Sequence, residues 1–315
     1  MFKKFLLVLL AVLFVVPQCF AADLLDYVPN NASLVLRSNI KQLVSIPEIK
    51  AQIDSFMSQE NEYSKQAKNM GFDPLKDIDN LLFFIPLDAQ QKNVVGDNIA
   101  FLFEGKFDIE KIVESINKDS NNNEEKATIS AEDGFRTITF VNGDKTAKML
   151  FFDNTIGVIG TLKGVENAKL VKLGKQPSIK KNQEFAASIS KFNQNATLAI
   201  VTAIPKDASA SLAANENTKA FCGIQFLNLD LTYNSNLNIN ISGDFAKGTD
   251  MKAVEKALNN FGDTAKANKA PYEVINDFAS NYRVTIEGLN AKVSSLITKA
   301  SIDKYIESQG KPQNK

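Results

Sequence analysis

Two stretches of the chain, NNASLVLRSNI at residues 30–40 and QNATLAIVTAI at residues 194–204, lie 164 residues apart and follow the same pattern. Each has asparagine at a turn near its start, followed by a run rich in leucine, valine and isoleucine, which is typical of a β-strand. The segments 98–107 and 236–245 match next, since each reads as a strand, a glycine and a phenylalanine ahead of a helix. Matches that recur in one order indicate an internal duplication.

A third match joins two aromatic and arginine pairs, Phe135-Arg136 and Tyr282-Arg283. Strand alternation places Arg283 on the face opposite Tyr282, where a charged side chain is either solvated or in contact with an anion or a partner. We therefore name Arg136 and Arg283 as the candidate binding residues. The sequence indicates no catalytic, cofactor-binding or metal-binding residue.

Apolar spacing predicts the local elements between these matches. Helices are expected over 46–57, 109–116 and 162–173, and residues 118–126 read as a polar loop. Three strands are expected between residues 135 and 160, because FRTITFV, TAKMLFF and TIGVIG are separated by short turn signals. Strands grouped through such turns favour antiparallel pairing.

The fold class predicted is α+β, with two tandem diverged repeats, each an antiparallel sheet with helices packed on one face. Repeat 1 is expected over residues 22–176 and repeat 2 over residues 177–310, because the polar stretch GKQPSIKKN suits a boundary. Residues 311–315 are expected to form a disordered tail. Repeat 2 is the shorter copy.

The first 21 residues, MFKKFLLVLLAVLFVVPQCFA, have the layout of a signal peptide, with two lysines before a short apolar run and a small residue at the cut. This predicts an exported protein, periplasmic or extracellular, with no transmembrane span in the mature chain. The alternative is a lipid anchor on Cys19. It is less favoured because Gln18 stands where a small residue is wanted.

Composition excludes several classes of function. The chain has 36 basic and 36 acidic side chains, and Arg37, Arg136 and Arg283 are its only arginines, so a nucleic-acid partner is not expected. It has no histidine, which excludes the common catalytic triads and most zinc sites. Removal of the leader leaves Cys222 as the single cysteine, and its setting, AFCGIQF, predicts an inert buried thiol. No cofactor is expected.

Carboxylates are the remaining acid and base groups. They gather at two places, Asp73, Asp77 and Asp79 in one turn and Glu104 and Asp108 at a strand-to-helix junction. A calcium site or a glycosidase-like pair would need such groups to converge. Helix capping and turn formation explain them better.

Phenylalanine is abundant in the predicted strands, as at Phe83, Phe84, Phe101, Phe103, Phe107, Phe151 and Phe152. These rings either form the core, in a chain that has no tryptophan, or line a pocket for a lipid or another apolar ligand.

The phrases YVPNNASLVL, GFDPLKDID and FEGKFDIEKI resemble secreted bacterial proteins of a domain-of-unknown-function family with a duplicated α+β unit. The resemblance covers most of residues 23–190, and its motifs are turns and caps. It implies export and a duplicated α+β architecture, and it implies no reaction.

These observations together predict an exported, non-enzymatic bacterial protein of the envelope or periplasm. It would act as a binding or structural module toward an unknown protein or envelope component. One alternative is a carrier of an apolar ligand or lipid. Another is a carboxylate-based enzyme or a calcium-dependent binder.

Overall fold

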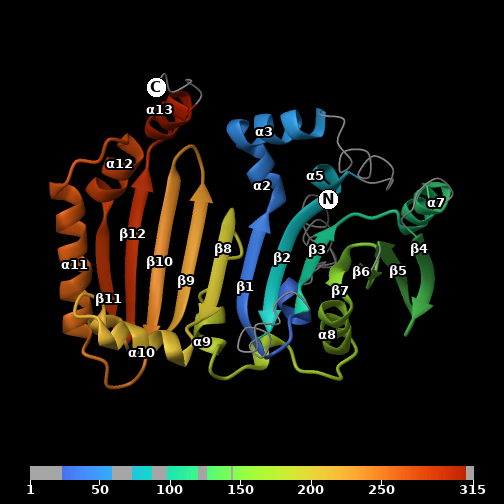
Figure 1. Ribbon diagram of the computed structural model, residues 1–315, viewed down its shortest axis with the longest axis horizontal. Coiled ribbons are helices and arrows are strands. Elements are labelled where there is room, and N and C mark those ends of the chain that lie inside the picture. Colours follow the sequence, from blue (N-terminus) through green and yellow to red (C-terminus); the bar gives the residue numbers. More distant parts are fainter. Residues whose placement is uncertain (1–22, 59–72, 87–97, 120–125, 143–144, 310–315) are drawn as a thin grey trace, which may run out of the picture.

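The computed structural model describes residues 23–58, 73–86, 98–119, 126–142 and 145–309. Its strands form one 12-stranded antiparallel sheet in the order β11-β12-β10-β9-β8-β1-β2-β3-β7-β6-β5-β4 (Figure 1). The strands are β1 (Ala32–Asn39), β2 (Ile78–Pro86), β3 (Ala100–Gly105), β4 (Lys126–Glu132), β5 (Phe135–Asn142), β6 (Lys145–Phe151), β7 (Ile156–Thr161), β8 (Leu198–Ala203), β9 (Ile224–Tyr233), β10 (Leu237–Phe245), β11 (Arg283–Glu287) and β12 (Asn290–Ile297).

The two halves of the chain meet at the centre of this sheet, where β1 pairs with β8. Val35 lies opposite Val201, Leu36 opposite Ile200 and Arg37 opposite Ala199. The predicted antiparallel α+β class is confirmed. The expectation of a separate sheet for each half is wrong, because pairing β1 with β8 removes two edges that would otherwise leave backbone groups unpaired.

Register assigns every strand side chain to one of two faces, since directly opposite residues share a face and neighbours along a strand alternate. We call the face that carries Leu36, Phe83 and Ile200 the front face. The back face carries Phe84 and Val201.

The back face of the first half holds the largest core. Leu82, Phe84 and Leu102 are fully buried there, and Leu150 and Val158 continue the cluster across β6 and β7. The elements that cover it are η1 (Leu24–Tyr27), α8 (Leu162–Lys172), η3 (Ile179–Lys181) and α9 (Ala186–Ile189). Because α7 (Ile109–Asp119) packs on the front face, the expectation that helices pack on one face is also wrong.

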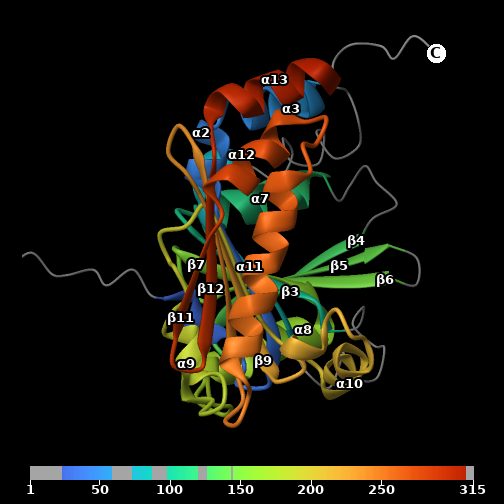
Figure 2. The ribbon, with the colours of Figure 1, turned by 90° about the vertical axis from the view of Figure 1, so that its left-hand side faces the viewer.

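Helices pack on the front face at both ends of the sheet. Ile112 and Ile116 of α7 (Ile109–Asp119) join Phe103, Ile138 and Phe151 in a second buried cluster. At the other end, α11 (Met251–Ala267) packs over β11 and β12, and α12 (Glu273–Asn281) follows it. Figure 2 shows that α11 and the curved strands β4, β5 and β6 extend to the same side of the sheet.

The remaining helices lie at the strand ends and return the chain from one strand to the next. They are α2 (Ile40–Ser45), α3 (Pro47–Ser58), α5 (Pro74–Asp77), α10 (Lys206–Ala214), η4 (Lys219–Phe221) and α13 (Lys299–Gln309). The expected boundary at 176–177 lies in a segment that bonds to the first half. The Asn30 amide donates to the Pro177 carbonyl, and the Ile179 amide to that of Val28.

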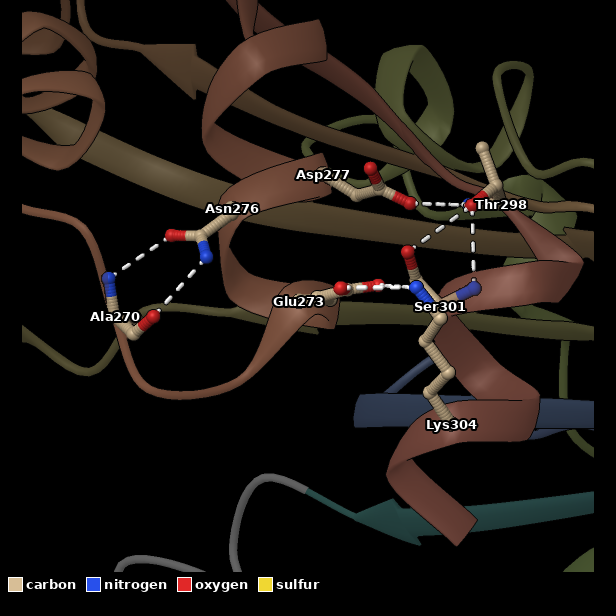
Figure 3. A network of polar contacts seen from close by, with 7 residues as sticks. All are labelled: Ala270, Glu273, Asn276, Asp277, Thr298, Ser301 and Lys304. Atoms are coloured by element: carbon tan, nitrogen blue, oxygen red, sulfur yellow. Dashed lines mark hydrogen bonds and ion pairs between the residues drawn. The ribbon is translucent and has the colours of Figure 1, made fainter. Parts of the chain in front are cut away.

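A polar network joins α12 to α13 (Figure 3). The Asp277 carboxylate accepts hydrogen bonds from the Thr298 amide at 2.9 Å and from its hydroxyl at 2.6 Å. Thr298 in turn accepts the Ser301 amide at 3.3 Å, as a cap at the start of α13, and Glu273 pairs with Lys304 at 2.8 Å. Burial acts to raise the pKa of the Asp277 carboxyl, but hydrogen bonds from Ser301 and Thr298 lower it below its ordinary value.

Leu82 tests the back-face core. Its side chain is fully buried, and Leu82→Ala should lower the free energy of unfolding by about 2–5 kcal/mol, since it removes apolar contacts and leaves a cavity. The matched control is Leu162→Ala, because Leu162 is 50% exposed and its loss should change stability by less than about 0.5 kcal/mol. Denaturant unfolding measures both, and equal losses would contradict this description of the core.

Asp277 makes stability depend on pH. A carboxyl whose pKa is lower in the folded state stabilises the protein above its unfolded pKa of about 3.9, and this contribution is lost as pH falls through the folded pKa. Asp277→Asn should therefore melt below the wild type at neutral pH, and the two melting temperatures should converge in acid. Asp263→Asn, at an exposed position of α11, is the control and should follow the wild type throughout. A gap that stays constant into acid would contradict the assigned role.

Candidate functional site

The front face of the central strands carries a continuous set of aliphatic and aromatic side chains, which we call the central apolar strip. It runs across β3, β2, β1, β8, β9 and β10 in that order. Its members share one face by register and comprise Phe101, Phe83, Ile85, Leu34, Leu36, Leu198, Ile200, Leu227, Leu229, Leu231, Ile239 and Ile241.

Every side chain of the strip is half-buried rather than fully buried. Among the described residues, none belongs to a buried core cluster or packs against one. Neighbouring strip residues contact one another instead, as the rings of Phe83 and Phe101 do at 5.0 Å between centroids. The strip is therefore apolar surface that the described helices leave without a packing partner.

The elements at either end of the strip differ from it in chemistry and in packing. In Figure 1, α11 and α7 lie at opposite ends of the sheet, and each belongs to its own buried cluster on the front face. Two polar side chains share the front face with the strip, Ser38 opposite Leu198 and Thr202 between Leu34 and Leu227. No charged residue is a member of the strip.

The expected carboxylate candidates act as caps and ion-pair partners. Asp73 accepts the Leu75 amide at 3.1 Å at the start of α5, and Asp108 accepts the Lys111 amide at 3.1 Å at the start of α7. Asp77, Asp79 and Glu104 bond respectively to the Asp73 amide, to Lys41 and to the Asn80 amide group. In the described part of the chain, no three histidine, cysteine, aspartate or glutamate side chains gather as metal ligands would.

Arg136 and Arg283 lie far apart in the strand order and on different faces. Arg136, on the front face of β5, pairs with Glu110 of α7 at 2.9 Å. A hollow of about 870 Å³ adjoins this pair and is lined by Lys106, Asp108 and Asn154. Since the pair is exposed, its contribution to stability is about 1 kcal/mol or less.

Arg283 lies at the edge of the sheet on its back face, opposite Ser294. Its guanidinium donates to the Tyr282 carbonyl at 2.8 Å, and it lines a hollow of about 310 Å³ with Asn238, Asn240 and Ser294. Counted outward from the centre, β11 is the fifth strand and β5 the sixth. The two aromatic and arginine pairs therefore do not occupy equivalent positions, and the third sequence match has no counterpart in the strand order.

Arg37 distinguishes the back face of β1. Burial lowers the pKa of its guanidinium, which Asp23 and Glu104 act to raise. Its buried Nε atom has no hydrogen-bond partner within the described residues. Ala199 lies directly opposite, so β8 supplies no matching charge.

Cys222 is exposed, so the prediction of a buried thiol is wrong. It follows the short helix η4 and lines a pocket of about 550 Å³ between the start of β1 and helix α10. Glu184 and Asp207 line the same pocket. The apolar neighbours of Cys222 in the sequence turn inward here, while the thiol itself faces the pocket.

The chain matches no protein-family model, no curated protein and no solved structure. The resemblance to secreted bacterial proteins therefore stays a prediction. Within the described residues, no helix is both long and apolar enough to cross a membrane. Residues 1–21, where the signal peptide is predicted, lie outside the described part of the chain.

Exposure of Cys222 predicts a thiol that reacts without denaturant. Native wild-type protein treated with an aromatic disulfide should release one more equivalent of the aromatic thiolate than Cys222→Ser does, because the Cys222 thiol is open to the pocket. Prior addition of denaturant should leave this difference unchanged. A Cys222 thiol that reacts only after unfolding would contradict its position.

Proposed function

We propose that this protein binds the hydrocarbon part of an envelope lipid on the central apolar strip. The observation that supports the proposal is the strip itself, a surface of leucine, isoleucine and phenylalanine across six neighbouring strands. Apolar patches of this extent mark sites of interaction. The proposal selects a lipid from the envelope components that the sequence made candidate partners.

The chemistry of the strip favours hydrocarbon over a protein partner. Even the buried centre of a protein–protein interface is only about 65% apolar, and it carries hydrogen-bonding groups that fix the partner's orientation. The members of the strip are all leucine, isoleucine or phenylalanine and offer no side-chain donor or acceptor. The hydroxyl of Thr202, which lies between Leu34 and Leu227 on the same face, donates to the Ala203 carbonyl at 3.2 Å. Such a surface gains free energy from any buried CH₂ group, about 0.8 kcal/mol each, and needs no directional contact.

We also propose that the chain consists of two tandem diverged units, over 22–176 and 177–310. The register at the centre supports this, because Leu36 lies opposite Ile200, and these two residues are separated by the same 164 positions as the two matched stretches. A twofold axis through this pair exchanges β1 with β8. The same axis superimposes Val35 on Ala199 and Arg37 on Val201. These are the residues on either side of Leu36 and Ile200 in the two strands.

The strand order extends this symmetry outward. From the centre, β1-β2-β3-β7 and β8-β9-β10-β12 pair in the same sequence of antiparallel neighbours. By this symmetry Phe101 corresponds to Ile241. The sequence match of 98–107 with 236–245 aligns Phe101 with Ile239 instead, two residues earlier on the same strand. A shift of two keeps each side chain on the same face of the strand.

Export and the absence of catalysis complete the proposal. The leader-like residues 1–21 support delivery to the periplasm or beyond, where envelope lipids occur. The carboxylates that could have formed an acid and base pair bond instead to amides and lysines. We therefore assign the protein a binding role without a reaction.

Tryptophan reporters test the proposal, because the chain contains no tryptophan of its own. Phe83→Trp and Ile200→Trp each place a single indole within the strip. A fatty acid brominated along its chain should quench both by at least twofold at saturation, since bound bromine atoms would touch the ring. Steady-state fluorescence measures the effect, after circular dichroism and melting confirm the fold of each variant.

The control is Thr285→Trp, at an exposed position on the back face of β11. Its emission should not change with the same ligand. Strip reporters that stay unquenched up to the solubility limit of the fatty acid would overturn the proposed function. Equal quenching of all three variants would mean contact through micelles rather than a site.

A further inference from the structure

The pocket of about 550 Å³ that Cys222 lines lies where the two halves of the chain meet, at the end of the central strands where β1 begins and β8 ends. Both halves supply its walls, with Ser33 from the first and Ala203 from the second. Its volume falls within the range of about 300–1,000 Å³ that is typical of small-molecule sites, which occur preferentially at such boundaries. We call it the junction pocket.

Much of the lining of the junction pocket is apolar. The rings of Phe185 and Phe226 meet nearly at a right angle, with 4.9 Å between their centroids. Ile204 and Ile224 add aliphatic surface. A lining of this kind covers the hydrocarbon part of a ligand.

Two carboxylates give the junction pocket its charge. Glu184 lies shortly before α9 and Asp207 in the first turn of α10, and Figure 2 shows these helices on opposite sides of the sheet. Both side chains are exposed, and neither forms an ion pair with another residue in the described part of the chain. Among the described residues that line the pocket, none is a lysine or an arginine. The rim of the pocket is therefore negatively charged.

This charge favours an organic cation as the ligand. Within the described ranges, Glu184, Asp207 and Cys222 do not gather closely enough to hold a metal ion. An ammonium group needs no such convergence, because each of its N–H groups can bond to a different carboxylate. A negatively charged ligand would be repelled by both carboxylates.

The junction pocket adjoins the end of the central apolar strip. Gln225 lines the pocket and lies two residues before Leu227 on β9, so both side chains are on the front face. Ile204 extends β8 by donating its amide to the Gln225 carbonyl at 2.8 Å. Four residues separate Ile204 from Ile200, which is about 13 Å along the strand. A ligand whose head lies in the pocket therefore has an alkyl chain of about this length within reach of Ile200.

We infer that the junction pocket binds the ammonium head of the lipid whose hydrocarbon lies on the strip. The inference rests on the proposed function and adds the chemical class of the ligand, a cationic amphiphile. Glu184 and Asp207 bind the ammonium group. The apolar lining covers the first carbons, and the chain continues past Gln225 to Leu227.

The Cys222 thiol reports whether the pocket is occupied, because it is exposed and lines the pocket. Its rate of reaction with an uncharged pyridyl disulfide is the rate of the full wild-type chain minus that of Cys222→Ser. Saturating decylammonium should slow this reaction by about fivefold or more, since a bound ligand blocks access to the thiol. Decanoate has a chain of the same length and the opposite charge, and should slow it by less than about twofold.

Glu184→Gln and Asp207→Asn should each raise the decylammonium concentration that gives half protection by about threefold, because each removes one negative charge. The double variant should raise it by about tenfold. Asp263→Asn removes an exposed carboxylate of α11 that does not line the pocket, and it should leave this concentration unchanged. Each variant is compared with its own ligand-free rate, and melting temperatures verify folding.

Decylammonium that carries bromine on its last carbon tests the connection between the pocket and the strip. In Ile200→Trp the bromine should quench the indole by about twofold or more, since the chain spans the distance of about 13 Å. Adding Asp207→Asn should weaken this quenching and the protection of Cys222 in the same proportion. Protection of Cys222 without quenching would contradict the proposed connection.

The outcomes separate the inference from the proposed function. Equal protection by decylammonium and decanoate, which needs only the wild type to observe, would overturn the ammonium site while leaving hydrocarbon binding intact. Full protection in the double variant would do the same. No protection by decylammonium would also overturn the site, and the tryptophan reporters with brominated fatty acid would then decide the proposed function independently.

Discussion

Backbone pairing between β1 and β8 is the constraint on which the rest of the structure depends. The two strands come from segments 164 residues apart, so their pairing carries a large loop-closure cost that only extensive burial can offset. It joins the seven strands of the first half to the five of the second. The backbone groups on the facing edges of β1 and β8 are thereby paired and closed to other chains. It also brings Leu36 and Ile200 face to face, which makes one apolar surface out of two.

The two faces of the continuous sheet differ in how far their side chains are buried. On the back face, residues such as Phe84 and Val201 are sealed under short helices, and the resulting core holds the two halves together. On the front face, α7 and α11 cover the ends, and the side chains between them stay half-buried. Buried clusters on the back face and under α7 and α11 on the front face stabilise the fold, and the surface proposed for binding lies between the two front-face clusters.

Sequence periodicity predicted the local elements well and the long-range pairing poorly. The predicted β5–β6 hairpin and the helix at α8 are confirmed, because turn residues and apolar spacing act locally. Strand β4 was missed because it is an edge strand with Thr128 and Ser130 among small residues, and α12 because no side chain caps its start. The sequence also indicated Phe83 and Phe101 as candidates to line an apolar pocket. Ile200 and Leu229 were placed beside them only by the register of β8 with its two neighbouring strands.

The central claim is that hydrocarbon occupies the front face of the central strands. Its most direct test is a native mass measurement on protein recovered from the cell envelope without detergent exchange. The account predicts ions that carry the extra mass of a lipid, and gentle activation should release that mass as an intact molecule. Protein that is consistently free of any such mass, from cells grown and lysed under several conditions, would contradict it.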